Sequence, residues 1–199
     1  MKIVKRVVTG GRNEDRAAHC RTANGAVLVV ADGAGNSGLG ARAAETVVAM
    51  AGRPEAASLN PSELLAEIDR SIAADSTAGE ATGVVVILHD RSLHGASVGD
   101  SGAWLLARDD ITDLTQRQAR KPLLGSGMTQ PVGFGPIGLT GRLLMATDGL
   151  FKYVAHHKLE ELALHTDIEH AADALCDAAR LANGELPDDI GLLLVDVQT

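Results

Sequence analysis

The sequence predicts an antiparallel, layered α+β fold, and three observations support this prediction. Strand-like apolar runs and helical periodicities occur in blocks along the chain instead of alternating strictly, which disfavours a parallel βαβ arrangement. Hydrophobic residues make up 45% of the 199 positions, enough for a substantial core. Neither a repeat nor a linker divides the sequence, so we expect one domain over 1–199.

The first half of the chain contains one clear buried strand and two helices. A β-branched run predicts the strand at 27–31, directly before Asp32. Small apolar residues recur at helical spacing over 40–51, and Gly52 is expected to end that helix. A second helix is predicted to begin after Asn60, whose side chain can cap its first turn.

The rest of the chain predicts mainly strands, then helices. Three strands joined by short turns are expected to form an antiparallel meander, at 83–89, 93–98 and 103–107. The stretch 116–141 is rich in Gly, Pro and Gln, and we expect it to be a loop. The final elements are a strand, two helices and a closing strand, at 142–147, 157–165, 168–183 and 190–197.

Composition and charge exclude several classes of function. The formal net charge is −8, from 18 Lys and Arg against 26 Asp and Glu, which disfavours nucleic-acid and membrane partners. The sequence shows no signal peptide and no apolar run near the ~20 residues that cross a bilayer, so we expect a cytoplasmic protein. Cys20 and Cys176 are too far apart for a zinc spacing, and two cysteines are too few to cross-link a secreted domain.

Two motifs resemble known sites but fit them poorly. The glycines of 33–38 match a dinucleotide-binding pattern, but Asp32 would place a carboxylate beside the pyrophosphate. His19 and Ser101 occur in the order of a trypsin-like protease, but helical patterns follow where an all-β double barrel should continue. We therefore predict neither a dinucleotide site nor a serine protease.

Acidic residues stand at the ends of several predicted strands. Asp32 and Asp148 each follow a strand, and Asp100 lies in a turn between two strands. Asp188 and Asp189 directly precede the closing strand. Because neighbouring antiparallel strands begin and end at the same edge of a sheet, these carboxylates could meet there and would then need cations. Oxygen ligands suit Mg²⁺ or Mn²⁺, although acidic residues at strand ends are also ordinary turn formers.

Short motifs along the chain follow an order that one family of enzymes shares. In sequence letters they are NED at 13–15, VVADGAG at 29–35, VGDS at 98–101, LMATDGLF at 144–151 and PDDI at 187–190. Each motif alone is weak, but five in the same order make coincidence improbable. In these residues the sequence resembles the metal-dependent protein phosphatases (PPM, or type 2C, serine/threonine phosphatases) of the compact bacterial type.

The resemblance implies a fold and a set of metal ligands. The family fold is a four-layer α/β/β/α sandwich of two antiparallel sheets flanked by helices. Asp32 would bridge two Mn²⁺ or Mg²⁺ ions, with the Gly33 carbonyl on one of them. Asp148 and Asp188 would ligate the other ion.

The resemblance also implies roles for further residues around the metal ligands. Glu14 would contact the two-ion centre directly or through water, and Asn13 and Asp15 would support the ligands from outside. Asp100 together with Asp148 would offer a weaker site for a third ion.

The sequence departs from the family pattern at three positions and in the length of one segment. The arginine expected to bind the substrate phosphate is Arg12, which lies directly before Asn13 of the NED motif. In the family pattern this arginine usually lies three residues before the Asn. Ala34 stands where the family has His or Met after Asp-Gly, and Gly102 replaces a common arginine. The chain between the VGDS and LMATDGLF motifs is short, so the flap subdomain is expected to be reduced or absent.

The function that the resemblance implies is hydrolysis of phosphoserine or phosphothreonine in proteins. A water or hydroxide bridging the two ions would attack phosphorus in line, with Asp32 and Asp148 holding this arrangement. The partners would be phosphorylated proteins, the substrates of a Ser/Thr kinase. The departures at Arg12, Ala34 and Gly102 leave one alternative, a weakly active or inactive phosphatase-like module that binds a signalling partner.

Overall fold

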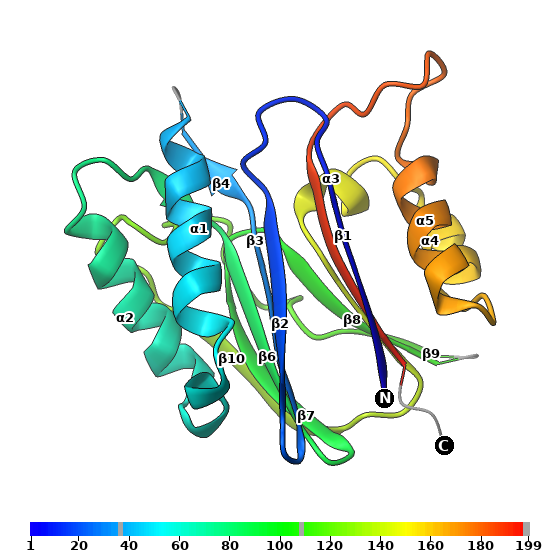
Figure 1. Cartoon of the computed structure of the whole chain (residues 1–199), viewed down its shortest axis with the longest axis horizontal. Coiled ribbons are helices and arrows are strands. Elements are labelled where there is room, and N and C mark those ends of the chain that lie inside the picture. The colour runs from blue at the N-terminus through cyan, green and yellow to red at the C-terminus, as the bar shows by residue number, and fades with distance from the viewer. Residues whose placement is uncertain (36–37, 108–109, 197–199) are drawn as a thin grey trace.

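Two antiparallel five-stranded sheets lie face to face in the computed structural model, which describes residues 1–35, 38–107 and 110–196 (Figure 1). In spatial order, sheet I consists of β1 (Lys2–Val8), β12 (Ile190–Asp196), β11 (Arg142–Ala146), β8 (Gly102–Ala107) and β9 (Asp110–Asp113). Sheet II consists of β10 (Val132–Gly138), β7 (Ser92–Val98), β6 (Gly83–His89), β3 (Gly25–Ala31) and β2 (Arg16–Thr22). A further short pair is β4 (Gly33–Ala34) with β5 (Glu80–Ala81).

Helices cover the outer face of each sheet (Figure 1). Sheet II is covered by α1 (Leu39–Ala51), the 3₁₀ helix η1 (Pro54–Ser58) and α2 (Pro61–Ala73). Sheet I is covered by α3 (Asp148–Phe151), α4 (His156–Ala163) and α5 (Ile168–Ala178). A third apolar cluster fills the space between the sheets. The predicted four-layer α/β/β/α sandwich is confirmed.

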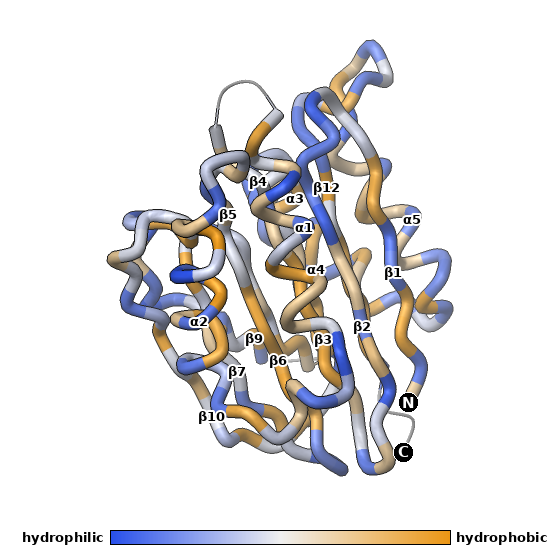
Figure 2. The backbone as a smooth tube through the Cα atoms, turned by 60° about the vertical axis from the view of Figure 1, so that its left-hand side comes forward, coloured by the Kyte–Doolittle hydropathy of each residue, from blue (hydrophilic) through white to orange (hydrophobic). Residues whose placement is uncertain are grey.

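This layering explains the apolar runs of the central strands. On β3, Leu28 and Val30 face the opposite sheet, whereas Val27 and Val29 face the helices, and all four are fully buried. Because both faces are covered, the strand sequence is continuously apolar instead of alternating. Figure 2 shows apolar residues along β6, the neighbour of β3 in the sheet.

Local signals placed the first helices correctly. The helix expected at 40–51 is α1, and the N–H of Gly52 bonds to the Val48 carbonyl at its end. The predicted cap of α2 is present, since Asn60 Oδ1 accepts two backbone N–H groups of the first turn at 2.9 and 3.4 Å. Strands β1 and β2 lacked such a signal, because charged, partly exposed side chains interrupt their apolar pattern.

Helix α5 is shorter than its apolar periodicity predicts. The helix expected at 168–183 ends at Ala178, because a tight turn follows it. In that turn Gly184 has a φ of 85°, and the Glu185 carbonyl accepts the N–H of Leu181 at 2.9 Å. These contacts compete with continuation of the helix.

Strand β8 does not belong to the expected meander. β6 and β7 pair as predicted, but β8 crosses to sheet I, where it pairs with β11 and β9. The chain crosses through Gly99, whose φ of 95° lies in the left-handed region that favours glycine. The crossing places Asp100 between the ends of the two sheets, which a hairpin within one sheet would not do.

The expectation of a loop throughout 116–141 is wrong over seven residues. β10 forms an edge of sheet II and pairs with β7, with a register shift between Phe134 and Ile137. The Phe134 ring lies over Gly95, where an added Cβ would approach it within 2.5 Å. Gly and Pro are compatible with an irregular edge strand, so cross-strand packing outweighed the turn-forming composition.

Some expectations fall outside these observations. Asn36 and Ser37, in the glycine motif at 33–38, and Val197, the last residue of the expected closing strand, lie outside the described residues. A single domain with a reduced or absent flap stays a prediction. Among the described helices, none combines the length and apolar character needed to cross a bilayer.

The N-terminus of α1 packs directly on the backbone that follows β3. A Cβ added at Gly40 would lie 2.6 Å from the Gly33 carbonyl carbon, and one added at Gly33 would lie 2.3 Å from the carbonyl carbon of Gly40. Both neighbours are backbone atoms, which cannot rotate away as a flexible side chain would. Glycine at both positions therefore permits the close approach that positions the end of β3.

The substitution Gly40→Ala has two opposing effects on the free energy of unfolding. Helix propensity alone would stabilise α1 by about 1 kcal/mol, whereas overpacking against Gly33 should cost about 1 to 3 kcal/mol. Because the obstruction is backbone, we expect net destabilisation in urea unfolding. Ala41→Gly, one position along the same helix, is the control and should cost only the propensity term of about 1 kcal/mol. An increase in stability of Gly40→Ala would show that the contact is not tight.

Candidate metal centre

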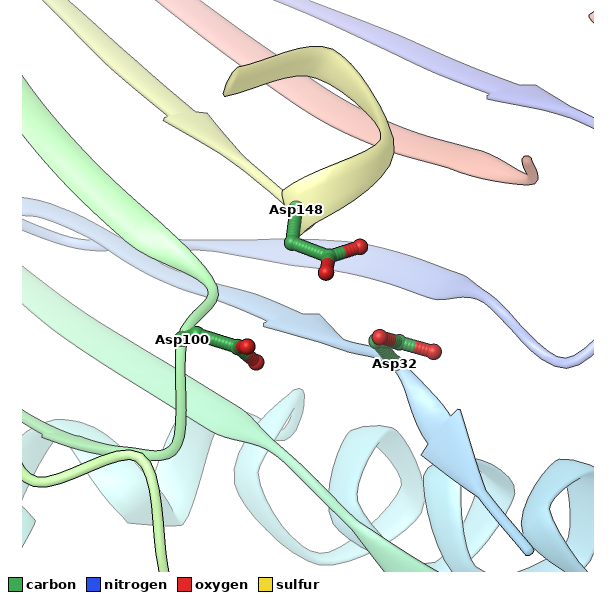
Figure 3. A group of neighbouring side chains, drawn as sticks. All are labelled: Asp32, Asp100 and Asp148. Atoms are coloured by element: carbon green, nitrogen blue, oxygen red, sulfur yellow. The ribbon is translucent and has the colours of Figure 1, made fainter. Parts of the chain in front are cut away.

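Three aspartates from different strands meet at one rim of the sandwich. Asp32 follows the last residue of β3, Asp148 begins α3 just after β11, and Asp100 lies at the crossing between the sheets. All three are partly buried, and their carboxylates point toward a common space (Figure 3). One oxygen from each lies within 4.8 Å of the others. The strand ends thus bring together carboxylates that lie far apart in the sequence.

A cavity of about 470 Å³ opens beside this cluster. Its lining consists of Gly11, Arg12, Glu14, Asp32, Gly33, Ala34, Asp148, Pro187, Asp188 and Asp189. Most of the candidate site residues therefore share one cavity, although they come from four separate parts of the chain.

Two expected residues lie at the margin of the cluster. The Asp188 carboxylate lies 3.9 Å from the Lys152 ammonium and does not belong to the group of three, although it lines the cavity. The exposed Asn13 side chain accepts a hydrogen bond from the Thr9 hydroxyl at 3.3 Å. Asn13 also has a φ of 57°, so its backbone turns the chain just before the acidic pair that follows.

Asp15 and Asp32 form a buried carboxyl pair. The two groups hydrogen-bond to each other, and Asp15 also accepts the Thr147 hydroxyl at 2.6 Å and the Gly191 N–H at 3.1 Å. Burial, with the neighbouring charge of Asp15, raises the pKa of Asp32 to about 9. Burial likewise raises the pKa of Asp15 to about 6. In the absence of a cation, this pair therefore shares a proton at neutral pH.

The remaining carboxyl groups also favour a bound cation. Burial raises the pKa of Asp148, and the charges of Asp100 and Asp188 raise it further. Burial raises the pKa of Glu14 as well, and its buried Oε1 has no hydrogen-bond partner among the described residues. An unpartnered buried oxygen beside mutually repelling acids fits a divalent ion. Because the donors are oxygens, Mn²⁺ or Mg²⁺ suits them better than zinc.

Asp189 was expected only as one of the acids that could meet at the sheet edge, and the structure gives it a different contact. It is only 4% exposed. Its Oδ1 accepts the N–H groups of Gly10 and Gly11 at 2.7 and 3.0 Å, and its Oδ2 accepts that of Glu14 at 2.8 Å. Asp189 therefore orders the loop before β2 from across the rim. In the sequence, its place in the PDDI motif before a buried apolar strand marked it as an acid at a strand end, but did not indicate these backbone donors.

The same loop brings Arg12 to the cavity. Its guanidinium lines the cavity and donates to the Gly35 carbonyl at 3.1 Å. The positive charge lowers the pKa of Glu14, against the larger raising effect of burial. An arginine directly before the NED motif thus reaches the cavity because the loop folds back onto Asp189. Its role as a phosphate ligand stays a prediction.

The other departures from the family pattern have visible packing consequences. Ala34 lines the cavity from β4 and offers no acid or base there. A Cβ at Gly102 would lie 2.7 Å from the Phe151 ring, so this ring takes the space that a side chain would need. Ser101 is fully buried, with its Oγ 2.6 Å from Thr82 Oγ1, and is no exposed nucleophile of a protease.

Comparisons with known proteins agree with the fold and the motifs. The sequence profile of the stage II sporulation protein E (SpoIIE) family matches residues 22–198. A search of curated protein sequences found no match.

Three solved structures illustrate the likeness in fold. The serine/threonine phosphatase PstP/Ppp of Mycobacterium tuberculosis has a TM-score of 0.82 and 20% identity, covering 100% of this chain and 99% of its own. The PstP catalytic domain in complex with two manganese ions has a TM-score of 0.81 and 20% identity, covering 100% and 98%. The PPM Ser-Thr phosphatase MsPP of Mycobacterium smegmatis has a TM-score of 0.80 and 19% identity, covering 100% and 99%.

The profile match extends over most of the chain, and the structural matches cover all of it. The resemblance that the motifs predict is thereby confirmed. The chain belongs to the SpoIIE family, and its fold is that of the PPM phosphatases.

Proposed function

We propose that this chain is a Mn²⁺- or Mg²⁺-dependent phosphatase that removes phosphate from phosphoserine and phosphothreonine in proteins. The observation that carries the proposal is the convergence of Asp32, Asp100 and Asp148, with oxygens within 4.8 Å, beside a cavity. The likeness in fold to the PstP catalytic domain, which was solved with two manganese ions, supports the same kind of cofactor.

The residues that would hold two ions are Asp32, Gly33 through its carbonyl, Asp148, Asp188 and Glu14. When bound, such ions would lower the pKa of a water to roughly 7 and offset the negative charge of a phosphate group. The backbone of Asp32 is held for this task by its own N–H, which donates to Thr82 Oγ1 at 3.0 Å, whereas the proton shared with Asp15 would leave when a cation binds. This contact holds the carboxylate at the end of a rigid strand.

Substrate binding needs positive charge, because the cavity is lined by acids that would repel a phosphate. Arg12 is the arginine of the lining. A guanidinium has five donors in a fixed fork and can pair with two phosphate oxygens at once. One donor reaches the Gly35 carbonyl at 3.1 Å, and among the contacts of the described residues the other donors are left free for a phosphate. We therefore assign the substrate phosphate to Arg12.

The partners that follow from this function are proteins phosphorylated by a Ser/Thr kinase. The expected cytoplasmic location and the expected lack of nucleic-acid and membrane partners stay predictions. The alternative of an inactive module that binds a signalling partner is separated from the enzyme by the assay below.

The function is tested by measuring phosphate release from phosphoserine and phosphothreonine peptides. We expect release that depends on Mn²⁺ or Mg²⁺, stops on chelation and is lost in Asp148→Ala. Tight peptide binding without phosphate release, unchanged by Asp148→Ala, would identify the inactive binding module instead.

Asp32→Asn should abolish Mn²⁺-dependent phosphate release and the rise in Tm that Mn²⁺ produces. At the same time it should stabilise the metal-free protein by about 1 to 2 kcal/mol, because an uncharged amide removes repulsion within the cluster. The pKa of Asp32 is raised in the folded state to about 9, so its ionisation opposes folding. The gain from the substitution should therefore grow as pH rises from the ordinary aspartate pKa toward about 9.

The matched control is Asp90→Asn, at an exposed turn where a φ of 53° suits either residue. This control should keep the activity and the Mn²⁺-induced shift in Tm. A metal-free Asp32→Asn protein less stable than the wild type would contradict the electrostatic account of the cluster.

Arg12→Ala should lower kcat/KM for a phosphopeptide by about 10- to 100-fold, because it removes charge-assisted hydrogen bonds to the phosphate. Most of the loss should appear in KM, and Mn²⁺ affinity measured by calorimetry should stay close to that of the wild type. Arg53→Ala removes the same charge from an exposed position before η1 and should be neutral. Equal kinetics for the two variants would exclude Arg12 as the phosphate ligand.

A further inference from the structure

Arg120 makes an ion pair with one member of the three-aspartate cluster. Its Nε and Nη2 lie 3.0 and 2.5 Å from Oδ2 of Asp100. Its charge also lowers the pKa of Asp148, against the larger raising effect of burial. The pairing with Asp100 in turn raises the pKa of Arg120. The guanidinium therefore acts electrostatically on two of the three carboxylates.

The geometry leaves part of Asp100 available to another cation. Both contacts from Arg120 go to Oδ2, while the carboxylate faces the side of the rim where Asp32 and Asp148 lie (Figure 3). One oxygen of Asp100 belongs to the group whose members lie within 4.8 Å of one another. The same carboxylate thus faces a guanidinium and the space where a divalent ion would bind.

We propose that Arg120 competes with a divalent ion for Asp100 and so sets how readily a third metal ion binds. This inference rests on the metal centre proposed above. The Arg120 side chain is 77% exposed, and an ion pair so open to water is weak and easily exchanged. A divalent ion among three carboxylates interacts with all of them at once, so it displaces the arginine at sufficient concentration.

Repulsion between the Arg120 charge and the divalent ion sets the expected size of the effect on binding of the third ion. At about 5 Å in water-like surroundings, a single positive charge weakens the binding of a divalent ion by about tenfold. Salt screens this repulsion over about 10 Å at 0.1 M ionic strength, so the effect should be largest at low salt.

The segment that carries Arg120 is tied to the same turn as Asp100. Gln118 donates through Nε2 to the Ser101 carbonyl at 2.7 Å. This bond keeps the segment at the rim when the guanidinium leaves the carboxylate. Arg120 therefore competes as a tethered cation with a high local concentration, unlike a cation in free solution.

The test is calorimetric titration of the full chain with Mn²⁺ at low salt. We expect two tightly bound ions in both proteins, and a weaker third ion that binds about tenfold more tightly in Arg120→Ala than in the wild type. The affinity of the two tightly bound ions should rise less in Arg120→Ala than that of the third ion, because Arg120 pairs with Asp100. Arg120→Lys keeps the charge and should resemble the wild type. Arg117→Ala removes an arginine from the same segment, where it lines a separate cavity beside β10, and should also leave the third ion unaffected.

Asp100→Asn completes a double-mutant cycle. It should abolish binding of the weaker ion, and Arg120→Ala added to it should have no further effect. If two ions bind tightly but Arg120→Ala leaves the third unchanged or weakens it, the competition is wrong while the metal centre stands. Absence of a third ion in both the wild type and Arg120→Ala would also overturn it. If no Mn²⁺ binds at all, the metal centre itself is wrong.

Discussion

Repulsion among carboxylates at the rim of the two sheets is the interaction on which the site depends. Asp15 and Asp32 share a hydrogen bond, and the charges of Asp100 and Asp188 act on Asp148. Burial makes this crowding more severe, because the low dielectric weakens screening by water. The folded chain can relieve the conflict by holding a proton or by binding cations, and divalent oxygen-loving ions do so most completely. The repulsion within the metal-free cluster is thus the physical reason for the metal centre that we propose here.

The rest of the fold holds these acids in place despite their repulsion. Apolar clusters on both sides of each sheet keep the strand ends rigid, and the contact between Gly33 and Gly40 fixes the backbone just after β3. Asp189 holds the loop before β2 through three backbone N–H groups. Its role is structural, but it brings Glu14 and Arg12 to the cavity. A buried acid with three donors organises a loop that the local sequence could not order alone.

Membership of the SpoIIE family and about 20% identity to solved PPM phosphatases mean that the fold is shared while most side chains differ. The acids at the strand ends are what this chain has in common with the family motifs. The surroundings have changed: Ala34 offers no proton, and the Phe151 ring fills the space beside Gly102. Positive charge near the acids comes from Lys152 and from Arg12 and Arg120, the last two on loops. In the functions proposed above, the balance between these acids and arginines decides how anions and cations bind at the site.

Local sequence determined what depends on local interactions. The sequence alone predicted the strand before Asp32, the Asn60 cap and the acids at strand ends. These features could be predicted because strand burial, capping and turn chemistry act over a few residues. Tertiary structure alone decided that β8 crosses to the other sheet, that Gly- and Pro-rich β10 is a strand, and that Arg12 reaches the cavity. Each of these outcomes depends on a partner distant in the sequence, such as β11, β7 or Asp189. Pairing and burial energies between such partners outweigh local propensity, and no pattern within one segment records them.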